Sequence, residues 1–343
     1  MDFSVLSVKD NEWQQIISKS IIYDFHHTSC YHSLETNSED KALLFVGTQE
    51  GNTIALPLLI RKIPQTDWYD ATSAYGYCGP VASKSFDEFS PEFIRQFQAE
   101  LLTYLKKENI ISAFSRLHPL METMPFFNDF GQVLDLNKTI AIDLTLPLEE
   151  QRKDYRKSNK SEINQLKKKK GYSVREIHPE ELKVFVEIYH QTMDRVEAKA
   201  YYYFDEDYFK KLLDNPCFNS RLLVAVKDGE IAAGAVFTLT DKIMQYHLAG
   251  TRDAYIRDTP MKLILDEARL LGNELGLEYL HLGGGVGGSD EDSLYRFKSG
   301  FSKNNFQFQV WNLIVDQAKY DQLVAQNNVD VTKAAGFFPL YRA

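Results

Sequence analysis

Cysteines and long apolar runs are both scarce in this sequence. The three cysteines, Cys30, Cys78 and Cys217, lie far apart and are odd in number, so they do not make the framework of a disulfide-rich domain or a metal-ligand pair. No stretch approaches about 18 consecutive apolar residues, which argues against a transmembrane segment. Residues 1–10 carry acidic side chains and lack the apolar core of a signal peptide. We therefore expect a cytoplasmic protein.

Positive charge is in deficit. The chain has 39 Lys and Arg residues against 48 Asp and Glu residues, a net charge of −9. This balance excludes a general nucleic-acid coat protein, although one basic patch is compatible with RNA binding. With 44% hydrophobic and 25% charged residues the composition is globular. A length of 343 residues is about twice the ~150 of one domain, so two domains are expected.

The sequence repeats itself. Two apolar runs, Ala42–Gly47 and Thr53–Ile60, flank a Gln-Glu-Gly-Asn turn and predict a β-hairpin. Ser220–Leu239 predicts a second hairpin around an Asp-Gly turn. A third β-like run follows each hairpin, at Ala74–Tyr77 in the first copy and at Ile243–Ala249 in the second.

Helices complete each copy. Pro91 and Pro260 each open a segment with apolar residues at helical spacing, and Gly276 is a suitable terminator of the second. Each copy also has an earlier amphipathic helix, at Glu12–Tyr23 in the first copy and at Glu180–Arg195 in the second. A closing strand ends each copy, at Ile111–Leu117 and at Tyr279–Leu282. The order helix, three strands, helix, strand therefore occurs twice, which predicts α/β domains with mixed sheets. The alternative is coincidence, because a hairpin followed by a helix is common.

A basic segment lies between the copies. Residues 152–170 contain nine Lys and Arg residues against two acids and predict a helix ending at Gly171. Two interpretations remain open. The segment is either the solvated face of a connecting helix or a phosphate-contacting surface that includes Arg152, Arg156 and Lys160.

Several motifs, in order along the chain, resemble the FemAB family of peptidoglycan aminoacyltransferases. They are Tyr75–Pro80, Thr139–Ile163, Thr192–Arg195 with Tyr203-Phe204, Leu282–Gly285, and Leu294–Phe301 with its Phe-Lys-x-Gly-Phe element. The resemblance implies two tandem GNAT domains, of the acyl-CoA N-acyltransferase type, in a short form without a coiled-coil arm. The first would cover 1–145 and be completed by about 312–343, and the second would cover 146–311 with the basic linker helix 152–170.

The resemblance also implies a function. It points to an aminoacyl- or acyltransferase that forms an amide bond on an amine of a peptidoglycan or surface-polysaccharide precursor, small or lipid-linked. No tightly bound cofactor is expected, and the donor co-substrate would be an aminoacyl-tRNA or an acyl-CoA, the first making tRNA a partner. Two alternatives remain: a CoA- or carrier-dependent N-acyltransferase acting on an amino sugar, and a non-catalytic glycan- or peptide-binding protein with the same fold.

Carried over by motif, Lys298 would lie near the acyl carbonyl with Phe297 beside it, as the catalytic residues. A surface lysine is the alternative. The substrate-binding residues would be Arg195, Lys199, Tyr203, Tyr246, Tyr75, Tyr77, Gly284 and Gly285. Lys199 and Tyr203 would share a helix face, although packing explains the tyrosine run 201–203 equally well. The glycine-rich stretch 283–288 would be a flexible turn near the acceptor.

The donor site lacks its usual glycines. A CoA-binding GNAT domain has glycines before its second helix, where backbone N–H groups hold the diphosphate. Here Pro260 and Lys262 fill those positions, which favours an aminoacyl-tRNA or an unusual donor over ordinary CoA.

No metal site or further nucleophile stands out. His26, His27 and His32 lack a carboxylate or cysteine at ligand spacing, so core or surface histidines are expected. Cys78 has no identifiable base, and packing beside a glycine explains it better than nucleophilic chemistry. Asp143 is either a general base or a strand-end residue.

Overall fold

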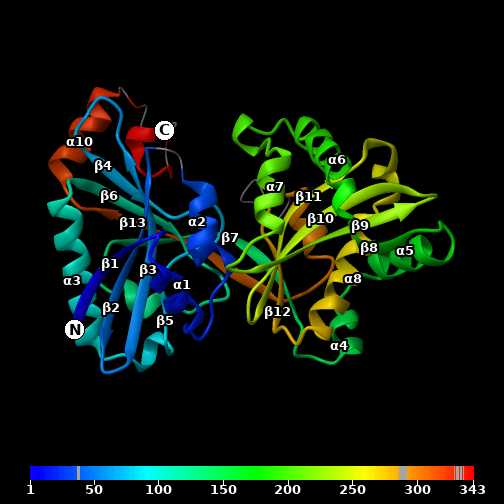
Figure 1. Ribbon diagram of the computed structural model, residues 1–343, viewed down its shortest axis with the longest axis horizontal. Coiled ribbons are helices and arrows are strands. Elements are labelled where there is room, and N and C mark those ends of the chain that lie inside the picture. Colours follow the sequence, from blue (N-terminus) through cyan, green and yellow to red (C-terminus); the bar gives the residue numbers. More distant parts are fainter. Residues whose placement is uncertain (37–38, 286–291, 328, 330–331, 333, 335) are drawn as a thin grey trace. The chain divides into compact units, whose positions relative to one another are not determined.

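The computed structural model describes residues 1–343 apart from 37–38, 286–291, 328, 330–331, 333 and 335 (Figure 1). The chain forms two compact units. Unit 1 comprises Met1–Leu136 and Gln307–Ala343, and unit 2 comprises Asn137–Phe306. Both boundaries fall inside strands, β7 (Gln132–Asp143) and β13 (Asn305–Ile314), so the chain passes between units in extended conformation.

Unit 1 is a mixed sheet with helices packed on it. The strand order is β1-β2-β3-β4-β6-β13, with β5 beside β3, and β4 pairs with β6 in parallel while the other pairs are antiparallel. Its strands are β1 (Asp2–Ser7), β2 (Lys41–Gln49), β3 (Asn52–Lys62), β4 (Tyr69–Thr72), β5 (Val81–Ala82) and β6 (Ile110–Arg116). Its helices are α1 (Asn11–Ser18), α2 (Ser29–Glu35), α3 (Pro91–Lys107) and α10 (Gln317–Gln326).

Unit 2 repeats this plan. The strand order β7-β12-β11-β10-β9-β8 contains one parallel pair, β11 with β12. Its further strands are β8 (Ser173–Glu176), β9 (Asn219–Lys227), β10 (Glu230–Leu239), β11 (Ile243–Thr251) and β12 (Tyr279–Gly283). Its helices are α4 (Leu148–Lys153), α5 (Lys157–Lys168), α6 (Leu182–Arg195), α7 (Glu206–Leu213), α8 (Met261–Glu274) and α9 (Ser293–Lys298).

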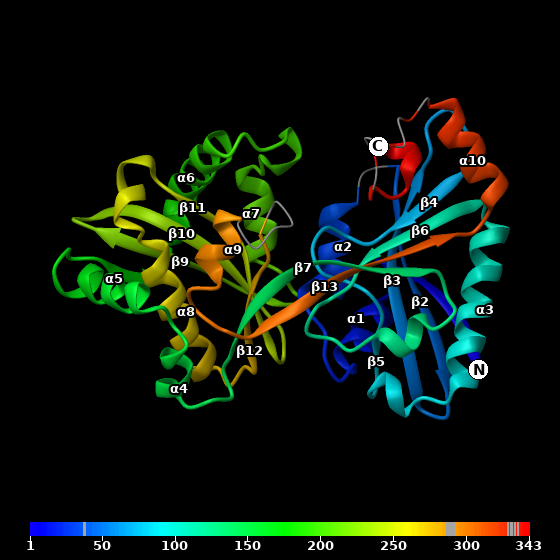
Figure 2. The same ribbon diagram turned by 180° about the vertical axis from the view of Figure 1, so that it is seen from behind.

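Helices cover both faces of the unit 2 sheet. Ala233 and Ala235 of β10 belong to the core shared with α5 and α8, whereas Gly234 between them lies against Phe185 of α6. Because side chains alternate along a strand, α6 and α8 lie on opposite faces. Helices α5 and α8 lie side by side (Figures 1 and 2). The strands between α6 and α8 are covered on both faces, and their sequences are therefore nearly continuous apolar runs.

The structure confirms the predicted mixed α/β class and both hairpins, β2–β3 and β9–β10. The third run of the first copy is wrong: β4 covers Tyr69–Thr72 instead of Ala74–Tyr77. Gly76 has a φ of +112°, which strand geometry does not allow, and Cys78 makes only an isolated bridge to Leu117.

Two predicted helices differ from those in the structure, one by ending earlier and the other by being interrupted. The first ends at Ser18 rather than Tyr23, because the backbone N–H of Ile21 donates to Ala82 O of β5. The basic segment is not one helix. It forms the end of α4 and then α5, with a break at residues 154–156, where Tyr155 is buried and Arg156 N–H donates to another segment.

Helix α6 approaches β11 so closely that only glycine fits at position 250. A Cβ there would lie 2.9 Å from both Ile188 O and Tyr189 Cα. We expect Gly250→Ala to lower the free energy of unfolding by about 1–3 kcal/mol, because backbone must move to relieve the overlap. Urea denaturation of the variant and of the parent chain measures this. An unchanged midpoint would contradict the packing of α6 on β11.

Candidate active site

The predicted catalytic lysine is buried in unit 2. Lys298 is the last residue of α9, and its side chain is 8% exposed. Its Nζ donates a hydrogen bond to Gly284 O at 2.7 Å and lies 5.7 Å from the centroid of the Tyr246 ring. Burial lowers the pKa of Lys298 to about 7, although Asp292 opposes the shift. The site therefore holds a cation that loses its proton near neutral pH.

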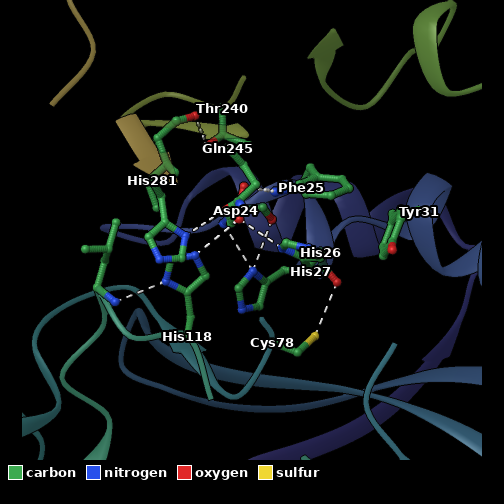
Figure 3. A network of polar contacts seen from close by, with 12 residues as sticks. Asp24, Phe25, His26, His27, Tyr31, Cys78, His118, Thr240, Gln245 and His281 are labelled. Carbon is green, nitrogen blue, oxygen red and sulfur yellow. Dashed lines mark hydrogen bonds and ion pairs between the residues drawn. The ribbon is translucent and has the colours of Figure 1, made fainter. Parts of the chain in front are cut away.

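Strands β11 and β12 separate next to this lysine. They pair at Ile243–Tyr279, Met244–Leu280 and Gln245–His281, and among the described residues no further pair joins them. The last pair is also joined by side chains, since His281 Nδ1 hydrogen-bonds Gln245 Oε1 (Figure 3). Tyr246 follows Gln245 directly, and Gly284 is the first residue after β12. Lys298 is therefore held between the two strands where their ladder stops.

Short-range contacts explain the glycines and the phenylalanine of the motif. Asp292 caps α9 by accepting from Tyr295 N–H at 2.8 Å, and a Cβ on Gly285 would lie 2.2 Å from its Oδ1. Glycine at 285 thus allows the cap that starts α9. Phe297 packs edge-on against the buried Phe301 at 5.5 Å. The remainder of the glycine-rich turn, 286–288, lies outside the described residues.

The structure gathers Lys298, Phe297, Tyr246, Gly284 and Gly285 at this point. Arg195 and Tyr203 instead lie around the C-terminal end of α6, where Arg195 pairs with Asp253 and Tyr203 donates to Asp194 at 2.8 Å. The helix expected to give Lys199 and Tyr203 one face is absent. Only a single 3-10 turn, Ala200–Tyr202, separates these two exposed residues, because α6 ends at Arg195.

Each of the three predicted phosphate-binding cations has a partner within the protein. Arg152 donates to Asn164 at 3.1 Å and lies 3.6 Å from Asp266. Lys160 donates to Lys153 O at 2.9 Å. Arg156 donates to Arg296 O and Ser299 Oγ, both at 2.8 Å. All three remain at least partly exposed, so their role in binding phosphate stays a prediction.

The two predicted tyrosines of unit 1 flank a turn that packs on buried histidines. Tyr75 is 36% exposed, and its carbonyl accepts from Tyr31 Oη at 2.9 Å. The Tyr77 ring meets the rings of His26 and His118 edge-on, each at 6.0 Å. A Cβ on Gly76 would lie 2.0 Å from His26 Nε2, so the His26 ring supports the turn directly.

Asp24 organises these histidines. It is fully buried and accepts from His26 Nδ1 at 2.9 Å and from His118 Nε2 at 3.2 Å. Burial alone would raise the pKa of Asp24, but the two histidines lower it well below its usual range. His118 Nδ1 accepts from Leu120 N–H, which leaves its proton on Nε2 for Asp24. His118 is the residue that sequence reasoning missed, since 94 positions separate it from Asp24.

The histidines of this region are buried residues of the core of unit 1. No group of three or more metal-ligating side chains occurs among the described residues. Burial lowers the pKa of His27 to about 3 and that of His32 to about 4. Cys78 is also buried; its thiol contacts His26 O at 3.2 Å, and burial raises its pKa to about 12. It is therefore a packing residue rather than a nucleophile.

The N-terminus of α8 is largely closed to anions. The N–H groups of Thr259, Lys262, Leu263 and Ile264 all donate to carbonyls of the same segment, and Pro260 has no N–H to offer. The Glu162 carboxylate of α5 also lies there, accepting from Thr259 Oγ1 at 3.2 Å and from Lys262 Nζ at 2.6 Å. In unit 1 the Ser90 side chain caps α3 instead. At both helices most of the N–H groups that a diphosphate cradle would use are therefore already bonded or absent.

Comparisons with known proteins fit this geometry. Residues 153–299 match the family model of the acetyltransferase (GNAT) domain. Among solved structures, the crystal structure of FemX has a TM-score of 0.75 at 12% identity, over 94% of this chain and 99% of FemX. L-PGS from Bacillus licheniformis has a TM-score of 0.57 at 15% identity, over 88% of this chain and 91% of that one. A tandem GNAT protein from the clavulanic acid biosynthesis pathway has a TM-score of 0.51 at 12% identity, over 92% and 98%.

No curated protein sequence matches the chain. At such low identities the structural likeness establishes the fold, and the chain has the FemAB-like tandem GNAT fold expected from its motifs. Within the described part of the chain, every helix is too short or too polar to cross a membrane.

Burial of Lys298 makes the stability of the protein depend on pH. Its folded pKa of about 7 lies below the ordinary value of 10.5, so the unfolded chain binds more protons between these values and stability rises with pH. We expect the stability of Lys298→Met, relative to the parent chain, to be highest at pH 7 and to decrease toward pH 10.

Urea denaturation at several pH values measures the difference. The matched control is Lys157→Met, which removes an exposed lysine and should follow the parent chain at every pH. Parallel pH curves for Lys298→Met and the parent chain would show that Lys298 is not buried as a titrating group.

Proposed function

We propose that this tandem GNAT-fold chain is an acyltransferase that forms an amide bond on an amine of a peptidoglycan or surface-polysaccharide precursor. The observation that carries the proposal is the buried Lys298, held where β11 and β12 separate. A cation excluded from water interacts strongly with charge that develops beside it. The GNAT match of residues 153–299 covers this lysine and supports acyl transfer.

The reaction requires a cation more than a base. The acceptor amine attacks the ester carbonyl of the donor, and a C–N bond forms as the oxygen becomes an oxyanion. The C–O bond of the ester then breaks, and the proton of the amine passes to the leaving hydroxyl. Lysine has three N–H donors, so Lys298 can bind the oxyanion while keeping its bond to Gly284 O. By analogy with a lost oxyanion-hole donor, this contact is worth about 3–4 kcal/mol.

The donor we propose is an aminoacyl-tRNA. The closed N-termini of α8 and α3 argue against a diphosphate cradle of the CoA type. The partly exposed cations Arg152 and Lys160 on the basic segment would contact phosphates of the RNA. The likeness to FemX supports a cell-wall precursor as acceptor.

A second candidate is a CoA-dependent N-acyltransferase. The match to an acetyltransferase domain favours it, because that match lies in unit 2, where Lys298 is found. It requires the donor to bind away from the N-terminus of α8, since Glu162 lies there.

Removing the lysine tests the chemical role. We expect Lys298→Met to fold and to lose about 10²–10³-fold in kcat/KM, which is the effect of losing one oxyanion donor. Because the ammonium is the acting form, the ratio of parent to variant activity should fall as the pH rises through 7. Transfer of a labelled acyl group, measured from pH 6 to 9, gives this ratio. Near-parental turnover would remove Lys298 from the site.

Retention experiments distinguish the donors. The chain is passed over immobilised aminoacyl-tRNA and over immobilised CoA at rising salt concentration. We expect retention on the charged tRNA that weakens with salt, because phosphate contacts release counterions, and no retention on CoA. Retention on CoA alone would favour the second candidate.

A further inference from the structure

The segment that carries Lys298 is too short to hold itself in place. Helix α9 has six residues, and a helix of that length is not stable alone in water. Its last carbonyls need partners. The carbonyls of Tyr295, Phe297 and Lys298 accept from the next residues, Ser299, Gly300 and Phe301. The carbonyl of Arg296 accepts from the Ser299 hydroxyl at 3.2 Å and, at 2.8 Å, from a different element, the residue that precedes α5.

Arg156 makes that contact and two more. Its Nη1 donates to Arg296 O and its Nη2 to Ser299 Oγ, both at 2.8 Å, while its backbone N–H donates to Gly300 O at 2.9 Å. The planar guanidinium presents Nη1 and Nη2 in a fixed fork to two acceptors on separate residues, a geometry that the compact ammonium of lysine does not reproduce. Arg156 therefore holds the chain on both sides of Lys298.

Asn159, one turn further along α5, completes the junction. It is buried, and its Nδ2 donates to Gly300 O at 3.0 Å. A Cβ on Gly300 would lie only 2.5 Å from that nitrogen, so the turn fits closely against the helix. The Tyr155 ring packs edge-on against the buried Phe301 at 5.1 Å. Successive residues of the basic segment thus contact the turn after Lys298 rather than solvent alone.

We propose that Arg156 is a positioning residue. It fixes the turn 296–300 so that the Lys298 ammonium reaches Gly284 O, where β11 and β12 separate. The inference rests on the proposed function for the role of Lys298 and goes beyond it for Arg156. A displacement of about 1 Å in such a group can cost 100-fold in rate. The guanidinium hydrogen bonds of Arg156 are thus made to other residues of the same chain. We therefore attribute its presence in the basic segment to positioning of the turn and not to binding of a ligand phosphate.

A spectroscopic experiment tests the positioning without any substrate. The chain is labelled with ¹³Cε-lysine, and the resonance of Lys298 is assigned by its absence from Lys298→Met. Among the described residues, the groups that interact with the Lys298 ammonium are the Asp292 carboxylate, Gly284 O and the Tyr246 ring, and none of them changes in the variants. We expect Arg156→Gln to move the titration midpoint of Lys298 up toward that of an exposed lysine. Lys157→Gln, which removes one charge from the next position, should leave it in place.

Kinetics give a second measurement. Arg156→Gln should lower kcat at least tenfold with little change in the KM of the donor, and Arg156→Lys should recover only part of the loss. In a Lys298→Met background Arg156→Gln should have no further effect, because both changes remove one interaction. Thermal unfolding confirms that each variant is folded.

The outcomes separate the two proposals. An unchanged titration midpoint of Lys298 in folded Arg156→Gln overturns the positioning role, whatever the activity. Equal losses in Arg156→Gln and Lys157→Gln, confined to the donor KM, would also overturn it in favour of a phosphate contact. If the titration midpoint of Lys298 rises in Arg156→Gln while the parent chain shows no acyl transfer, the positioning role stands and the proposed function is rejected.

Discussion

The hydrogen bond from the Lys298 ammonium to the Gly284 carbonyl is the contact on which the site depends. An ammonium removed from water is unfavourable unless polar groups replace the lost hydration. Here one carbonyl and the face of Tyr246 do so; Tyr246 lies on β11, and Gly284 comes directly after the end of β12. The Asp292 cap, the close approach at Gly285 and the packing of Phe297 on Phe301 together hold α9 so that Lys298 Nζ lies beside Gly284 O.

The two units use the same fold with different polar interiors. Unit 2 surrounds a cation with a carbonyl and a ring, whereas unit 1 surrounds the anion Asp24 with two imidazole donors. The anion is fully buried and binds His26, whose ring supports the Gly76 turn. In both units a buried charge with directional partners holds an irregular segment that the sheet alone would leave unsupported.

Local patterns made much of this predictable. The hairpins follow from alternating apolar residues around short turns, and the closed N-terminus of α8 follows from Pro260 and Lys262. Contacts between residues far apart in the sequence could not be predicted. Nothing near Glu162 indicates that its carboxylate lies at α8, and the charge of Arg156 indicates phosphate binding as readily as a carbonyl contact. Composition does not change at the unit boundaries either, because both lie inside ordinary strands.

Those boundaries have a consequence for the order in which the protein matures on the ribosome. Unit 1 needs β13 beside β6 and Trp311 in its core, yet these residues follow the whole of unit 2 in the chain. The half that is synthesised first is therefore the half that is finished last. Until translation reaches the final segment, β6 has an open edge, and a nascent chain stalled near residue 306 would expose it to aggregation.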